Sequence, residues 1–101
     1  MSPDATITIQ QIRQHRADIK AILNQRKASN LRVFGSVAEG KGRRDSDVDF
    51  LVAMDPDATL IDLIGLKQDL AALLGTEVDV VSDDAIHPRL ERRVRATAVP
   101  L

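Results

Sequence analysis

Three aspartates stand in two short apolar runs of this chain, where their carboxylates can act together. Asp47 and Asp49 open the run SDVDFLVAM, and Asp79 lies in TEVDVV. Residues two apart on a strand point to the same face, with backbones about 7 Å apart. Carboxylate oxygens are ligands for Mg²⁺, and two such ions can hold the attacking and leaving oxygens of a phosphoryl displacement. The three residues therefore predict a site for two Mg²⁺ ions, with Asp79 contributed by a neighbouring strand.

A Gly-Ser pair lies just upstream, at the end of an earlier apolar run. Gly35 lets the backbone approach a phosphate closely, because it has no side chain. The Ser36 hydroxyl and the following backbone N–H groups are suited to holding phosphate oxygens. Lys41 and Arg43 add positive charge to the same loop. We therefore predict that these four residues bind the phosphates of a nucleotide.

Two other motifs partly match the same stretch, and both fail on specific residues. A phosphate loop over residues 35–42 requires Ser or Thr after Lys41, and the chain has Gly42 there. It also requires a helix to begin at that point, whereas a strand is expected. A calcium loop starting at Asp45 requires Gly at its sixth position and Glu at its twelfth, where the chain has Phe50 and Pro56. Neither motif is therefore retained.

A structural interpretation of the paired acids stays open at this stage. Charges at the start of a strand can simply mark an exposed sheet edge, where they prevent association with other strands. In that case Asp47 and Asp49 would have no chemical role.

The hydrophobic pattern predicts the order helix, strand, loop, strand, helix, strand, helix. Thr8 resembles a helix N-cap with Gln11 as its capping-box partner, and Thr59 resembles a second N-cap before a helix that ends at Gly75. The remaining limits are strands over 31–34, 47–54 and 77–81, helices over 8–27 and 88–97, a loop over 35–46 with one helical turn at 36–39, and a tail over 99–101.

These elements predict a single α/β domain over residues 1–101. The strand–helix–strand unit over 47–81 is expected to be a right-handed parallel crossover, which places Asp79 beside Asp47 and Asp49. The first two strands can pair antiparallel. The result is a small mixed sheet of three to four strands with helices packed on it.

Composition excludes several classes of function. The chain is 44% hydrophobic and 29% charged, with a net charge of −1, no Cys and only two aromatic residues, Phe34 and Phe50. The low net charge and the lack of stacking platforms predict no direct nucleic-acid binding. No apolar run approaches the length of a membrane span, and no secretory signal is visible, so we expect a cytoplasmic protein without a membrane partner.

The pattern G-S-x-A-x-G-x(5)-S-D-x-D resembles the minimal nucleotidyltransferase family, small relatives of the DNA polymerase β superfamily. It covers Gly35 to Gly40 and then Ser46 to Asp49, and the V-D-V-V around Asp79 matches the family's third acidic strand. The resemblance implies the nucleotidyltransferase fold with ATP as substrate. Glu39 departs from the pattern, because many relatives carry a basic residue there, and an acid near bound phosphates would weaken nucleotide binding.

The resemblance also implies a partner. Such proteins are commonly encoded beside a HEPN-type toxin and act as its antitoxin, in some cases by transferring AMP from ATP to a toxin tyrosine. This chain contains no Tyr, so a tyrosine acceptor must lie on another protein. Its small size leaves no acceptor domain, which predicts a hetero-oligomer or a homodimer, and Asp79 is the candidate to activate the acceptor hydroxyl. Two alternatives stay open: an antitoxin that acts by binding alone, and transfer to a small-molecule hydroxyl.

Overall fold

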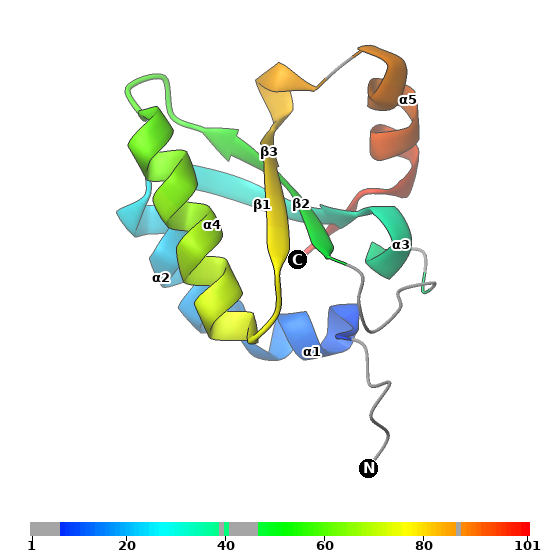
Figure 1. The fold of residues 1–101 in the computed structure, drawn as a ribbon, viewed down its shortest axis with the longest axis horizontal. Helices are drawn as coiled ribbons and strands as arrows, with labels where there is room; N and C mark the ends of the chain where they lie inside the picture. The colour runs from blue at the N-terminus through cyan, green and yellow to red at the C-terminus, as the bar shows by residue number, and fades with distance from the viewer. Residues whose placement is uncertain (1–6, 39, 41–46, 87) are drawn as a thin grey trace.

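The computed structural model describes residues 7–38, 40, 47–86 and 88–101. Its elements follow one another as shown in Figure 1, where the chain is coloured from blue to red. The helices are α1 (Ile9–Gln14), α2 (Arg16–Gln25), α3 (Gly35–Ala38), α4 (Leu60–Leu74) and α5 (Pro88–Thr97), with a 3₁₀ turn, η1, at Asp83–Ala85. The strands are β1 (Ala28–Phe34), β2 (Val48–Met54), β3 (Val78–Ser82) and β4 (Val99–Pro100).

The four strands form one mixed sheet in the order β3-β2-β1-β4. β1 pairs antiparallel with both β2 and β4, while β2 pairs parallel with β3 through the α4 connection. The predicted α/β fold, the antiparallel first pair and the parallel strand–helix–strand unit are therefore confirmed. The central position of β2 decides where the site lies, because its residues have neighbours on both sides.

One face of β2 forms the centre of the hydrophobic core. Val48, Phe50 and Val52 are completely buried, as the alternation of the sequence predicts. They pack with residues from the helices on that face, above all Leu66 and Leu70 of α4 together with Ile12 of α1 and Ile19 of α2. Figure 1 shows α2 and α4 on the same side of the sheet. Burying one such side chain contributes about 1.5–3 kcal/mol, so this face fixes the position of β2.

The N-terminal helix differs from the prediction, because the expected single helix over 8–27 is divided at His15. His15 has φ −97° and ψ 17°, and its N–H donates to the Ile12 carbonyl at 3.0 Å instead of continuing the regular pattern. The break changes the direction of the chain, and both Ile12 and Ile19 are buried. The predicted cap is confirmed: Thr8 Oγ1 accepts the Gln11 N–H at 3.2 Å.

Two further segments extend beyond their predicted limits. β1 begins at Ala28 instead of Leu31, with a bulge between Ser29 and Arg32. The expected tail contains an edge strand, since Val99 pairs with Val33. A two-residue strand is too short to show a periodic pattern, and its Pro100 is tolerated because an edge strand need not donate every N–H.

The strand–helix–strand unit formed by β2, α4 and β3 follows the prediction closely. Thr59 and Asp62 form the expected capping box at the start of α4, and Gly75 ends the helix with φ +66°. The helical turn predicted within the loop is present as α3, beginning at Gly35. None of the helices in the described part of the chain is both long enough and apolar enough to cross a bilayer.

Candidate active site

The sheet brings the predicted aspartates together at the start of β2 and β3. Asp49 and Asp79 are directly paired in the parallel register of the two strands, so their side chains share one face. Asp47 immediately precedes β2 and is exposed, as is Asp79, whereas Asp49 is half-buried. The crossover through α4 therefore does what the sequence predicted, because it places the third acid beside the other two.

The paired acids influence one another's charge. Burial raises the pKa of Asp49 above its ordinary value, and the negative charges of Asp79 and Asp47 raise it further. All three effects disfavour the ionised form of Asp49. A cation at this position would relieve the repulsion, and clusters of this kind are typical of functional sites.

Gly35 is in contact with the same carboxylate. It directly follows Phe34, which pairs with Asp49 across the antiparallel ladder, and it begins α3 with φ +76°. A Cβ at this position would lie 2.5 Å from Asp49 Oδ2, a separation that real Cβ atoms essentially never show. The backbone conformation therefore favours glycine, and a Cβ here would also displace the Asp49 carboxylate. The sequence predicted a phosphate contact for Gly35 but not this contact with Asp49.

The donor set fits a hard divalent cation, although the side chains do not already enclose one. Among the described residues, no three His, Cys, Asp or Glu side chains are arranged to hold a metal ion. Asp47 and Asp79 are exposed, so their carboxylates can rotate toward an ion without repacking the core. Oxygen is the ligand that Mg²⁺ takes. The metal-binding role of Asp47, Asp49 and Asp79 stays a prediction.

The predicted phosphate-binding residues are only partly described. Gly35 and the backbone of Ser36 lie in α3, beside the Asp49 carboxylate. Lys41 and Arg43 lie outside the described residues, as does the divergent Glu39, and the Ser36 side chain is likewise not described. Their nucleotide-binding roles stay predictions.

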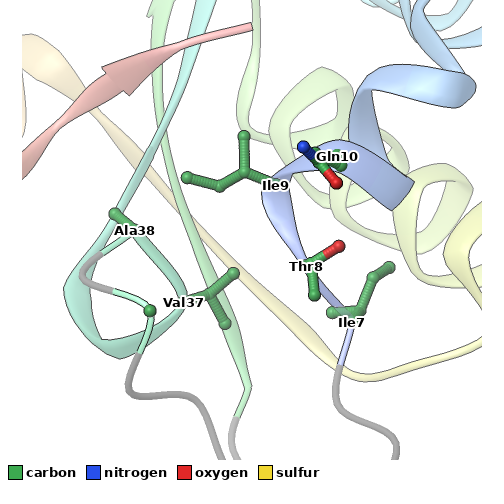
Figure 2. Close-up of a pocket in the computed structure, with 7 residues that line it drawn as sticks. Ile7, Thr8, Ile9, Gln10, Val37 and Ala38 are labelled. Atoms are coloured by element: carbon green, nitrogen blue, oxygen red, sulfur yellow. The ribbon is translucent and has the colours of Figure 1, made fainter.

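A hollow of about 280 Å³ lies next to α3, between that helix and the start of α1. Figure 2 shows its lining, in which Ile7 and Ile9 face Val37 and Ala38, with Thr8 at the base of α1. The Thr8 hydroxyl is already engaged in the helix cap. None of the described residues in the lining is charged, so these side chains offer no charge to a phosphate or a metal ion.

An ion pair on the same sheet face was not anticipated from the sequence. Arg32 of β1 pairs in register with Leu51, and its Nη2 lies 3.1 Å from Asp83 Oδ2 in η1. The Arg32 side chain is only 17% exposed, so this contact is better shielded than a surface pair. It connects β1 with the turn that follows β3, which helps to hold the Asp79 strand. A basic residue within an apolar strand was the signal available in the sequence.

Comparison with known proteins agrees with this geometry. A family described as the nucleotidyltransferase domain matches residues 12–99. Protein adenylyltransferase MntA of Thermococcus cleftensis is 33% identical over 91 residues, which cover 89% of this chain and 92% of the relative. A solved structure of a candidate minimal nucleotidyltransferase has a TM-score of 0.82 at 40% identity and covers 96% of this chain and 99% of its own. A crystal structure of a toxin–antitoxin with AMP-PNP has a TM-score of 0.70 at 27% identity, covering 83% of this chain and 69% of the matched one. The register pair of aspartates, the glycine against it and these matches lead to one conclusion: the chain belongs to the nucleotidyltransferase domain family, as a minimal nucleotidyltransferase.

Proposed function

We propose that this chain is an antitoxin that transfers AMP from ATP to a tyrosine hydroxyl of a HEPN-type toxin. The observation that carries the proposal is the in-register pair of Asp49 and Asp79, with Gly35 packed against Asp49. Two similarities support the choice of reaction. MntA of Thermococcus cleftensis is named a protein adenylyltransferase, and a structure with the same fold is a toxin–antitoxin with AMP-PNP.

The three aspartates would bind the metal ions, and the loop residues would bind the phosphates of ATP. Mg²⁺ held by Asp47, Asp49 and Asp79 would neutralise the charge on the phosphates and on the leaving group. Gly35 and Ser36 would hold the phosphates at the start of α3, with Lys41 and Arg43 supplying further positive charge. These contacts would orient the α-phosphate toward the exposed Asp79, where an acceptor can approach in line.

The reaction is a displacement at the α-phosphorus of ATP. The tyrosine oxygen forms a bond to the α-phosphorus, and the bond from that phosphorus to the bridging oxygen breaks, so pyrophosphate leaves. The tyrosine proton passes to the Asp79 carboxylate, which is exposed and able to act as a general base. The acceptor belongs to another chain, because this one has no Tyr.

The proposal is tested with ATP labelled on the α-phosphate and a purified HEPN-type toxin. We expect AMP on a toxin tyrosine, mapped by mass spectrometry, and toxin inactivation at substoichiometric antitoxin. Asp49→Asn and Asp79→Asn should each lower transfer by about 10²-fold or more, since each removes a preorganised charge. Neutralisation that ignores ATP and requires equimolar protein would instead establish occlusion. Label on a small-molecule hydroxyl, with none on the toxin, would establish the other alternative.

A further inference from the structure

The exposed apolar side chains of α4 are concentrated at its N-terminal end. Among the described residues, the large hydrophobic side chains that are exposed are Leu60, Ile61 and Ile64, at 70%, 75% and 48%. Their spacing places them on one side of the first two helical turns. Leu66 and Leu70, which pack into the core, lie on the other side of the same helix. The apolar positions of α4 therefore serve two surfaces, the core and an exposed patch.

A hollow adjoins this patch and shares Leu60 with it. It measures about 470 Å³ and lies where β2, α4 and η1 meet, with Met54, Leu60 and Leu63 forming its apolar part. Two carboxylates, Asp55 and Asp84, belong to its lining. The apolar patch is thus bordered by negative charge, which is the complement of a basic side chain.

The acidic border distinguishes between two kinds of protein that could cover the patch, a second copy of this chain and a different protein. If a second copy of this chain covered the patch symmetrically, the two copies would present the same surface to each other, and the described residues of the patch and the hollow include no Lys or Arg to pair with Asp55 and Asp84. A different protein that presents apolar side chains beside Lys or Arg fits both parts of the surface. Amphipathic helices recognise their targets in this way, with apolar anchors spaced along one face.

We infer that Leu60, Ile61 and Ile64, together with the hollow containing Asp55 and Asp84, form the surface that holds the toxin. This inference rests on the proposed function for the identity of the partner. It assigns the partner a helix with apolar anchors for the patch and at least one basic side chain for the hollow.

The surface that binds the toxin lies away from the aspartates that would catalyse AMP transfer. Asp49 and Met54 are five residues apart along β2, which corresponds to about 17 Å of extended strand. The surface therefore lies at the opposite end of the strand from the carboxylates. Substitutions there should change the affinity for the toxin without changing the chemistry at Asp49 and Asp79.

The decisive variant combines Leu60→Gln with Ile61→Gln. Both side chains are mostly exposed and Gln favours helices, so the fold should be retained. The matched control is Ala72→Gln, an exposed position on the same helix outside the patch. Calorimetry with the purified HEPN-type toxin should show at least a 10-fold loss of affinity for the double variant and less than a 2-fold change for the control. Transfer should fall through a higher KM for the toxin, with kcat retained.

A second pair of variants, one test and one control, examines the carboxylates that border the patch. Asp55→Asn should weaken toxin binding several-fold at low salt, and the effect should shrink as salt is raised. Asp18→Asn removes an exposed charge from α2, outside the surface, and should leave binding unchanged.

Each outcome decides the inference independently of the proposed function. Unchanged toxin affinity in the Leu60→Gln, Ile61→Gln variant would overturn the inference, even where AMP transfer to the toxin is intact. A wild-type dimer that this variant disperses in analytical ultracentrifugation would also overturn it, because the occupant would then be a second copy. Conversely, a toxin that binds through the patch but receives no AMP would overturn the proposed function and leave the inference standing.

Discussion

Gly35→Ala tests the contact on which the site depends. The residue has φ +76°, and a left-handed conformation costs a side-chain-bearing residue about 1–2 kcal/mol. The added Cβ would lie 2.5 Å from Asp49 Oδ2, whereas ordinary contacts begin at 3.4 Å. The carboxylate must therefore move by about 0.9 Å, the difference between those two distances. Because a displacement near 1 Å can lower a reaction rate about 10²-fold, we expect transfer to fall by that factor.

Gly75→Ala is the matched control, because it introduces the same backbone strain without the contact. Gly75 has φ +66°, and a Cβ there meets nothing within 4 Å. Both variants should lose about 1–2 kcal/mol of unfolding free energy from the conformation alone. Only Gly35→Ala should lose transfer, and Gly75→Ala should stay within a few-fold of wild type. The assays are urea unfolding and transfer of AMP from labelled ATP.

A double-mutant cycle separates the strain from the clash. In an Asp49→Ala background the obstructing oxygen is gone, so Gly35→Ala should destabilise the protein by the backbone term only. Two results would refute the reasoning. One is full transfer by Gly35→Ala, which would mean that the Asp49 position does not matter for the reaction. The other is an equal destabilisation by Gly35→Ala with and without the Asp49 carboxylate, which would mean that the two groups do not touch.

Three further predictions concern stability. The pKa of Asp49 is raised in the folded protein, so its favourable contribution to the free energy of unfolding is fully present below the ordinary carboxyl pKa and is lost as pH rises through the raised value. Urea unfolding in EDTA should show this loss of stability in wild type and not in Asp49→Asn. Identical pH profiles of stability for the two proteins would contradict the prediction. Thr59→Ala removes the capping hydroxyl of α4 and should cost about 1 kcal/mol in the same assay, with no change in transfer at saturating substrate. Gly65→Ala places a Cβ against the Arg26 guanidinium, so the gain of about 1 kcal/mol in helix propensity should appear only in an Arg26→Ala background. An equal gain in wild type would show that Arg26 moves aside freely.

Much of the site could be predicted because it depends on local periodicity. The alternation along β2 places Asp49 opposite the core face, and the length of α4 requires a parallel crossover that returns Asp79 to its side. Both inferences need only the period of a strand and the handedness of a connection. The turn at Gly35 was likewise visible, since the end of one apolar run and a Gly-Ser pair mark it.

The parts that were missed depend on contacts between distant residues. The break at His15 was not visible in the sequence, because Ile12 and Ile19 are seven residues apart and fit one face of a continuous helix as well as they fit two helices. The pairing of Val99 with Val33 joins the two ends of the chain across a sheet edge. The Arg32–Asp83 ion pair and the exposure of Ile61 also follow from the assembled fold and not from any local pattern.

The position of Asp49 in the sheet argues against a merely protective role for this acid. A charge that prevents strand association belongs on an edge strand, with its side chain in solvent. Asp49 lies on β2, which has β1 on one side and β3 on the other, and it is half-buried. Its register partner is Asp79, and like charges directly opposite one another destabilise a sheet. A protective role would require neither the burial nor the pairing, whereas a cation-binding role requires carboxylates to converge in this way. A bound cation would offset the unfavourable charge on Asp49, so we predict that wild-type protein gains more stability from added Mg²⁺ than Asp49→Asn does.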